Sequence, residues 1–285
     1  MEPPPLLPAQ ALTPQFVESE YNNRARVADH GDYFARWERD SQFVRATLLG
    51  HLDLAYGPEA RHRIDLFPAA RARGLLVFIH GGYWRSLDKA MFSWLAASWV
   101  AGGIGVAIPN YRLCPAVRIE QIIDDVVAAL NWLFAHGARY GLATERVVLS
   151  GHSAGGHLTG ALFAQPRARL TFDPARIVGG VPMSGLVDFE PLLHSSFNAD
   201  FCLDPEAVSR LNLYDKRPTL AAPLVIAVGG DESSEFKRQS RLLAHAWSAQ
   251  AKALLVLDGR NHFSIVDAFA ERGQPLYDSA LALLG

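Results

Sequence analysis

The sequence contains one segment in which a serine stands between two glycines, Gly-His-Ser-Ala-Gly at residues 151–155. The segment follows a short apolar run at 146–150 and precedes a stretch at 155–165 that we expect to be helical. On a sharp turn between a strand and a helix, a serine is exposed above the sheet and can act as a nucleophile, and flanking glycines permit that turn. An ordinary turn in which Ser153 caps the helix is the alternative. The order of strand, turn and helix favours the nucleophile.

A second segment, His-Gly-Gly-Tyr-Trp at residues 80–84, directly follows the apolar run at 75–79. Acyl transfer needs N–H donors aimed at the oxyanion that develops on the carbonyl, and a glycine-rich loop lets the backbone approach it closely. We expect the backbone amides of Gly82, Tyr83 and Ala154 to form this oxyanion hole. The alternative is a plain turn whose tryptophan belongs to the core.

A serine is a weak nucleophile at neutral pH and needs a base. In folds that place the serine on such a turn, the acid follows the serine in the chain and the histidine comes last. Three histidines lie far enough along: His194 in an aperiodic stretch, His245 inside the predicted helix at 234–250, and His262 just after the predicted strand at 253–257. Because loops at strand ends carry function, His262 is the expected base.

The acid must orient the imidazole and stabilise its protonated form. Asp231 follows the predicted strand at 223–228 and two glycines, so it should emerge at the same edge of the sheet as the serine. Glu232, Glu235 and Asp258 compete with it. We predict Asp231, because a turn at a strand end fixes a short side chain better than a helix surface does. Its alternative role is to cap the following helix.

Other histidines point to no metal. His152 and His157 are five residues apart rather than the four that would place two ligands on one helical face, and no His-Glu-x-x-His segment occurs. His80 is expected to be structural, bonding to neighbouring backbone. The sequence also lacks the glycine patterns of nucleotide-binding loops. We therefore expect neither a metal nor a cofactor.

The remaining chain alternates short apolar runs with longer amphipathic stretches, which is typical of a parallel sheet covered by helices on both faces. The predicted strands cover residues 75–79, 104–108, 146–150, 177–181, 223–228 and 253–257. The predicted helices cover residues 88–101, 119–136, 155–165, 234–250 and 275–284. The aperiodic stretch at 188–217 is expected to form a small cap of short helices. These features place the chain in the α/β class.

The N-terminal part predicts additional elements. Residues 46–52 and 62–66 should form two short antiparallel strands at the edge of the sheet. Residues 15–45 mix acids and arginines and should be helical, whereas the proline-rich residues 1–15 should form a mobile arm. No repeat or linker divides the sequence, so we expect residues 1–285 to form one domain.

Composition excludes several classes of function. The 285 residues include 27 Lys and Arg against 29 Asp and Glu, a balance that does not suit a nucleic-acid backbone. The longest apolar stretch, residues 95–108, is too short to cross a bilayer, and the first residues do not form a secretory signal. Only Cys114 and Cys202 are available for a disulfide. We expect a soluble cytoplasmic protein without a membrane partner; a homodimer is compatible with the sequence.

With the serine, the histidine and the glycine-rich loop in place, the chain resembles the α/β-hydrolase fold, and more narrowly the kynurenine formamidase (arylformamidase) family and related esterases. The similarity covers residues from about 52 onward and lies in successive blocks. The blocks are Leu-Ala-Tyr-Gly at 54–57, Ile-Asp-Leu-Phe-Pro at 64–68, His-Gly-Gly-Tyr-Trp at 80–84, Gly-His-Ser-Ala-Gly-Gly-His-Leu at 151–158, Ser-Gly-Leu-Val-Asp-Phe-Glu-Pro-Leu at 184–192, Glu-Phe-Lys-Arg-Gln-Ser at 235–240 and His-Phe-Ser-Ile-Val at 262–266.

The resemblance implies a cofactor-free, cytosolic serine hydrolase with Ser153, Asp231 and His262 as its catalytic triad. It implies a small-molecule acyl substrate with an aromatic leaving group, such as N-formylkynurenine, which would be cleaved to formate and an aromatic amine. A carboxylesterase for short acyl or aryl esters needs the same residues and is the first alternative. A catalytically silent hydrolase fold used for binding is the second.

Aromatic residues near the predicted site could form the substrate pocket. Tyr83 and Trp84 lie in the glycine-rich loop, and Phe197, Phe201 and Phe263 lie on predicted loops. Such side chains could line a cleft for an aromatic leaving group. For each of them, ordinary packing in the core or the cap is the alternative.

Overall fold

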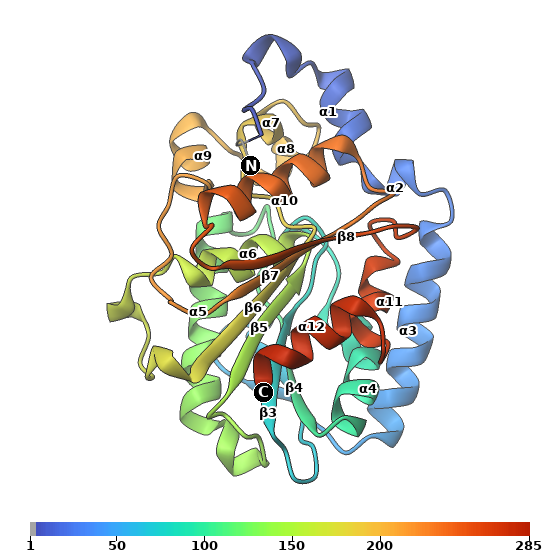
Figure 1. Ribbon diagram of the computed structural model, residues 1–285, viewed down its shortest axis with the longest axis vertical. Helices are drawn as coiled ribbons and strands as arrows, with labels where there is room; N and C mark the ends of the chain where they lie inside the picture. Colours follow the sequence, from blue (N-terminus) through green and yellow to red (C-terminus); the bar gives the residue numbers. More distant parts are fainter. Residues whose placement is uncertain (1–3) are drawn as a thin grey trace.

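An eight-stranded sheet lies at the centre of the computed structural model, which describes residues 4–285 (Figure 1). Its strand order is β1-β2-β4-β3-β5-β6-β7-β8; β2 is antiparallel to β1 and β4, and the other pairs are parallel. The strands are β1 (His51–Ala55), β2 (Arg63–Phe67), β3 (Gly74–Ile79), β4 (Ile104–Pro109), β5 (Val147–His152), β6 (Ile177–Met183), β7 (Leu224–Gly229) and β8 (Ala251–Leu257). The predicted mostly parallel sheet is confirmed.

All residues of β3, β4, β5 and β7 are buried, as expected for strands covered on both faces. The antiparallel edge is also confirmed, but its first strand begins at His51 rather than at residue 46. The preceding helix continues to Thr47, because Trp37, Ser41 and Val44 form a buried stripe at helical spacing.

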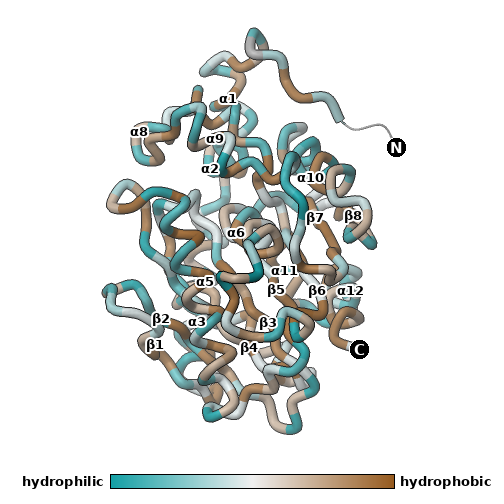
Figure 2. Tube along the Cα trace, turned by 90° about the vertical axis from the view of Figure 1, so that its left-hand side faces the viewer, coloured by the Kyte–Doolittle hydropathy of each residue, from teal (hydrophilic) through white to brown (hydrophobic). Residues whose placement is uncertain are grey.

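Helices cover both faces of the sheet (Figure 1). The first face carries α5 (Ile119–His136), α6 (Ala154–Phe163) and α10 (Ser234–Ala246), and the second carries α3 (His30–Thr47), α4 (Ala96–Ala101), α11 (Ile265–Ala270) and α12 (Pro275–Leu284). Figure 2 shows hydrophobic residues along the central strands beneath them. Among the described residues, no helix combines the length and apolarity required to cross a membrane.

Several predicted helices differ in detail from those in the structure, and the stretch predicted as helical at 15–45 is divided into three helices. The stretch predicted as one helix at 88–101 is a 3₁₀ segment, η2 (Lys89–Leu95), followed by α4. The helix predicted at 234–250 ends at Ala246. Helix α11 follows the loop of His262 and lacked a separate signal, since its six residues are too few to show a helical period.

Three short helices form the predicted cap: α7 (Glu190–Leu193), α8 (Asn198–Phe201) and α9 (Pro205–Leu211). Two further helices of the N-terminal segment, α1 (Pro14–Tyr21) and α2 (Asn23–Arg26), lie near α10 at the same end of the molecule (Figure 1). Of the predicted mobile arm, residues 1–3 lie outside the described residues, and Leu12 is buried. Mobility of this arm stays a prediction.

Because the strands are parallel, the loops after β3, β5, β7 and β8 all lie at the carboxyl ends of the strands, on the same side of the molecule. Ile79 pairs with Gly151 across β3 and β5, and Gly229 pairs with Leu257 across β7 and β8, so these strands end level with their neighbours. The loops that follow carry the chemistry-bearing residues identified from the sequence. The fold therefore gathers them where ligands bind in open α/β sheets.

Candidate active site

Ser153 lies on a sharp turn between β5 and α6. Its backbone has φ +57° and ψ −118°, a conformation that is unfavourable for a residue with a side chain. The surroundings enforce it: a Cβ at Gly155 would lie 1.9 Å from the carbonyl oxygen of Ile79, and one at Gly151 would lie 2.2 Å from that of Gly155. Only glycine fits at the positions two residues before and two residues after the serine, as the sequence motif predicts.

His262 lies in the loop after β8, and its imidazole is oriented by a buried carboxylate. The Nδ1 atom lies 2.6 Å from Oε2 of Glu232. Because a carboxylate accepts hydrogen bonds, Nδ1 carries the proton and Nε2 is left to accept one. The other carboxylate oxygen, Oε1, accepts hydrogen bonds from the Ser184 hydroxyl at 2.6 Å and from the Gly229 backbone amide at 2.7 Å.

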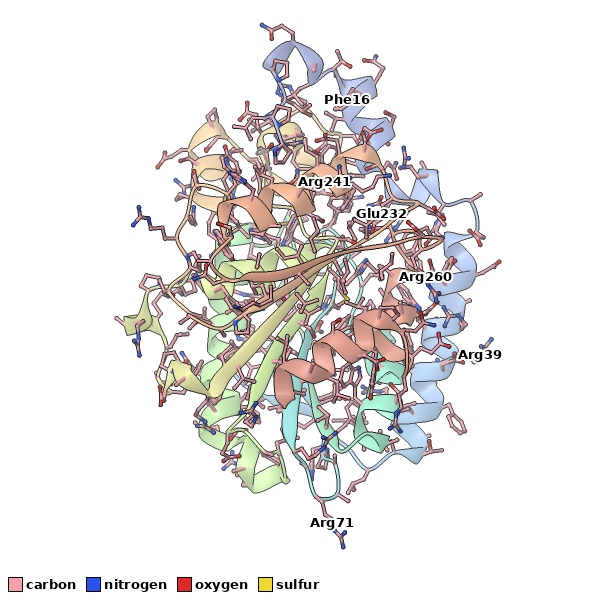
Figure 3. All side chains as sticks on the ribbon, in the orientation of Figure 1. Phe16, Arg39, Arg71, Glu232, Arg241 and Arg260 are labelled. Carbon is pink, nitrogen blue, oxygen red and sulfur yellow. The ribbon has the colours of Figure 1, made fainter. Side chains whose placement is uncertain are left out.

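The structure corrects the predicted acid, because Glu232 and not Asp231 contacts His262. Asp231 is exposed, and its backbone amide donates to the carbonyl of Arg260 at 3.1 Å. The turn after β7 is closed by a hydrogen bond from the amide of Glu232 to the carbonyl of Gly229, 3.2 Å long. This turn directs the residue after Asp231 back toward the sheet. Figure 3 shows Glu232 close to where α10 begins.

His152, the second residue of the serine motif, supports the loop of His262. Its Nε2 lies 2.7 Å from the backbone carbonyl oxygen of His262, and the two rings lie 4.7 Å apart between centroids. Burial, together with the nearby imidazole of His262, holds the pKa of His152 well below its usual range. His152 is therefore neutral and can donate from Nε2. No sequence pattern indicated this supporting role.

The glycine-rich loop passes directly beside the serine. A Cβ at Gly81 would lie 3.1 Å from the Cβ of Ser153, and Gly82 and Tyr83 have positive φ angles of +109° and +51°. Within the part of the chain that the structure describes, the backbone amides of these two loop residues and of Ala154 donate to no protein acceptor. Unpaired donors beside the serine are what an oxyanion hole requires. That role stays a prediction for all three.

His80 anchors the loop as a structural residue, as expected. Its Nδ1 lies 2.7 Å from the carbonyl oxygen of Gly81 and its Nε2 lies 2.9 Å from Oδ1 of Asn110. Tyr111 stacks on the ring at 4.3 Å and donates its hydroxyl to the backbone carbonyl of His80. Burial lowers the pKa of His80 to about 4, so the ring is neutral near pH 7.

Ser153 and His262 both line a cavity of about 390 Å³. Among the described residues, the Ser153 hydroxyl has no hydrogen-bond partner, and serine–base contacts commonly tighten only when substrate is bound. The predicted pocket residues Phe197 and Phe263 line this cavity, and so does Tyr83 of the glycine-rich loop. Aromatic side chains therefore form part of the wall of the cavity that contains the serine.

Two predicted pocket residues do not line the cavity. Trp84 is fully buried and packs against Phe189 and His157, and Phe201 is buried against Trp84. Both belong to the core between the glycine-rich loop and the cap. Consecutive side chains of the loop point in different directions, so Tyr83 lines the cavity while Trp84 packs into the core.

The N-terminal helices supply a wall of the cavity that was not predicted from the sequence. Residues of α2 and α3, with the residue that precedes α2, line the cavity: Asn22, Asn23, Arg24, His30, Phe34 and Trp37. Their only sequence signal is an aromatic spacing, Phe34 and Trp37 three residues apart, which fits a helix packed by one face. Which surface that face would cover could not be read from the spacing.

Replacing Gly82 by alanine is expected to lower kcat/KM by about 10²- to 10³-fold, the cost of losing one oxyanion donor. The added Cβ would lie 2.2 Å from the carbonyl oxygen of Ser86, at a φ of +109°, so the loop must move. Steady-state kinetics on the purified variant measure the effect. The control is Gly31→Ala in α3, where no atom lies within 4 Å of the added carbon. Equal activities of the two variants would exclude the loop from the reaction.

Comparisons with known proteins agree with this geometry. The sequence profile described as "alpha/beta hydrolase fold" matches residues 76–252, more than half of the chain. Kynurenine formamidase of Drosophila melanogaster is 28% identical over 234 residues, 76% of each chain, and that of Salmo salar is 23% identical over 290 residues, 96% of each chain. These relatives match this chain over most of their length.

A solved structure is similar over nearly the whole chain. The crystal structure of a provisionally assigned thioesterase from Silicibacter sp. TM1040 is 34% identical, has a TM-score of 0.83, and aligns over 92% of this chain and 97% of its own. The matching family profile and the similar solved structure both indicate the alpha/beta hydrolase fold. The chain belongs to the alpha/beta hydrolase fold family and is a hydrolase.

Proposed function

We propose that this protein is a cofactor-free serine hydrolase that removes a formyl group from an aromatic amide of the N-formylkynurenine type. The observation that carries the proposal is that Ser153, on its strained turn, and His262, held by Glu232 at 2.6 Å, open onto one aromatic cavity. The kynurenine formamidases among its relatives support the formamide substrate.

The proposed reaction begins with attack of the Ser153 hydroxyl oxygen on the formyl carbon. His262 Nε2 takes the hydroxyl proton, and Glu232 stabilises the imidazolium through Nδ1. The amides of Gly82, Tyr83 and Ala154 bind the oxyanion of the tetrahedral intermediate. When the C–N bond breaks, His262 returns the proton to the nitrogen, and the aromatic amine leaves.

The second half of the reaction releases the acyl group. The formyl group is now an ester of Ser153, and water attacks it after losing a proton to His262. Breaking the ester bond returns that proton to the serine oxygen and yields formate. The proposed steps use the side chains of Ser153, His262 and Glu232, three backbone amides and one water molecule.

The size and lining of the cavity fit a small acyl group and an aromatic leaving group. About 390 Å³ lies within the usual range for small-molecule sites, and Phe34, Phe197 and Phe263 form part of its wall. The acyl end must lie against the glycine-rich loop, where Gly81 approaches Ser153, which leaves the aromatic wall for the amine. This arrangement supports an aromatic leaving group.

A short-chain carboxylesterase is the second candidate, because ester cleavage needs the same serine, base and oxyanion donors; the solved structure at 34% identity is itself provisionally assigned to the cleavage of a related bond, as a thioesterase. The test compares kcat/KM for N-formylkynurenine and for p-nitrophenyl acetate with the same preparation. We expect the formamide to be the better substrate by at least about tenfold, a difference of about 1.4 kcal/mol in activation free energy. A formamide rate at background together with rapid ester cleavage would establish the esterase instead.

A further inference from the structure

The cavity that holds Ser153 is lined by two arginines, Arg24 and Arg85, and, in residues 4–285, by no aspartate or glutamate. The carboxylate of Glu232 lies behind His262 and does not line it. A pocket lined by cations without anions favours a negatively charged ligand. The near-neutral net charge of the whole chain, −2, gives no hint of this local imbalance.

The two arginines differ in what neutralises them. Arg85 forms an ion pair with Asp200 of α8, and its guanidinium lies over the ring of Phe197, 4.9 Å from the centroid. This arginine therefore already has its counter-charge and its stacking partner. It acts as a brace between the glycine-rich loop and the cap.

Arg24 has no such counter-charge. No carboxylate oxygen lies within 4 Å of its guanidinium among the residues that the structure describes. Partial desolvation by the surrounding residues and the neighbouring charge of Arg85 lower the pKa of Arg24, although a guanidinium remains protonated at any physiological pH. Because Asp200 neutralises Arg85 but no described acid pairs with Arg24, a bound anion would supply the counter-charge that Arg24 lacks.

The position of Arg24 is nevertheless fixed. Its Nη2 lies 3.3 Å from the Ser86 hydroxyl oxygen, and its guanidinium carbon lies 5.3 Å from the centroid of the Phe34 ring. Ser86 in turn donates to the carbonyl of Gly82 at 2.9 Å, which connects Arg24 to the glycine-rich loop. The remaining N–H groups of the guanidinium are free to bind a planar anion in a bidentate manner.

Arg24 is exposed, whereas Ser153 is buried, so Arg24 lies at the mouth of the cavity and Ser153 at its inner end. In the proposed reaction the acyl carbon must meet Ser153, and the leaving group must extend toward the mouth. We propose that Arg24 binds a carboxylate on the leaving group and so selects aromatic substrates whose leaving group carries one. This inference rests on the proposed hydrolase function and deepens it by assigning the substrate's charge.

The test uses Arg24→Gln in the full-length enzyme and two matched pairs of substrates. The first pair is 3-carboxyformanilide and its neutral 3-carbamoyl analogue; the second is 3-carboxyphenyl acetate and 3-carbamoylphenyl acetate. We expect the variant to lose about 5- to 20-fold in kcat/KM on each carboxylate substrate and less than about 2-fold on each carboxamide, since one partly exposed charged hydrogen bond is removed. Arg24→Lys should recover part of the loss.

Arg26→Gln is the matched control. Arg26 lies in the same short helix, does not line the cavity that holds Ser153, and pairs with Glu20 at 3.7 Å. It should leave the preference for carboxylate over carboxamide unchanged. An equal loss of Arg24→Gln on charged and neutral substrates, or the same change of preference in Arg26→Gln, would overturn the proposal.

The end of the substrate that carries the charge is tested with phenyl hydrogen succinate, an ester whose carboxylate lies on the acyl side. If Arg24→Gln lost kcat/KM only on this ester, Arg24 would bind an anion on the acyl side rather than on the leaving group, which would contradict the assignment. The ester pair reports on Arg24 even when the formamides are not cleaved, so failure of the formamidase proposal is distinguishable from failure of this one. Binding of 3-aminobenzoate to Ser153→Ala, measured by calorimetry, supplies a readout without turnover. The affinity should be weaker in the double variant that also carries Arg24→Gln.

Discussion

Replacing Ser153 by alanine is expected to lower kcat by about 10⁵- to 10⁶-fold, leaving only the rate that binding and the oxyanion donors supply. His262→Ala should cost nearly as much, because the serine cannot lose its proton without the base. The double variant should be about as slow as either single variant, since the residues act as one unit. The measurement is kcat on N-formylkynurenine and on p-nitrophenyl acetate.

Folding and labelling provide the controls for this first prediction. Ser153→Ala removes one oxygen that has no hydrogen-bond partner among the described residues, so its thermal unfolding should match that of the wild type. An organophosphonate should label the wild type at Ser153 and should not label Ser153→Ala. Multiplicative losses in the double variant, or labelling at another residue, would contradict a shared catalytic unit. Absence of labelling in the wild type would favour a binding protein with a silent hydrolase fold.

Glu232→Gln is expected to lower kcat by about 10³- to 10⁴-fold, as removal of the orienting carboxylate does in other serine hydrolases. A glutamine NH₂ group facing Nδ1 would favour the tautomer with its proton on Nε2, which cannot accept the serine proton. The amide would also supply no charge to stabilise the imidazolium. Steady-state kinetics on N-formylkynurenine and on p-nitrophenyl acetate measure the loss.

Asp231→Asn is the matched control, because it changes the adjacent carboxylate in the same way. Asp231 is exposed and does not contact His262, so its variant should retain kcat within about 3-fold, as surface substitutions usually do. Unfolding curves show whether Glu232→Gln keeps its contacts with Ser184 and Gly229. A large loss in Asp231→Asn with an active Glu232→Gln would restore the aspartate as the acid.

The elements nearest the nucleophile were predictable because their signals are local. Strands β3 and β5 are continuous apolar runs, and each leads into a glycine-containing loop whose conformation excludes side chains. The position of His262 followed from chain order and from the end of the last strand. In these cases the pattern of a few consecutive residues specifies both the element and the orientation of its end.

The carboxylate that contacts His262 is Glu232, one residue after the predicted Asp231. Asp231 and Glu232 are adjacent and carry the same charge, so no periodicity distinguishes them. The distinction depends on how the turn after β7 closes and on two donors that come from elsewhere, Ser184 after β6 and His262 after β8. Contacts between residues 30 and 48 positions apart decided which carboxylate is buried.

The cavity wall that the N-terminal helices supply depends even more on contacts between residues far apart in the sequence. The Tyr21 hydroxyl donates to Oε2 of Glu235 at 2.6 Å, and the Tyr83 hydroxyl donates to the Tyr21 carbonyl at 2.5 Å. These bonds connect α1 to α10 and to the glycine-rich loop, and they place α2 with Arg24 over the cavity. Nothing in the sequence of the N-terminal segment indicates where it docks.

The sequence by itself predicted the sheet, the serine turn, the glycine-rich loop and the histidine at the end of the last strand, because each depends on backbone conformations that neighbouring residues enforce. Only the tertiary structure decided that Glu232 orients His262, that Trp84 and Phe201 belong to the core, and that an arginine of the N-terminal segment lies at the mouth of the cavity. These features depend on which side chains meet across the fold, and a linear pattern does not contain that information.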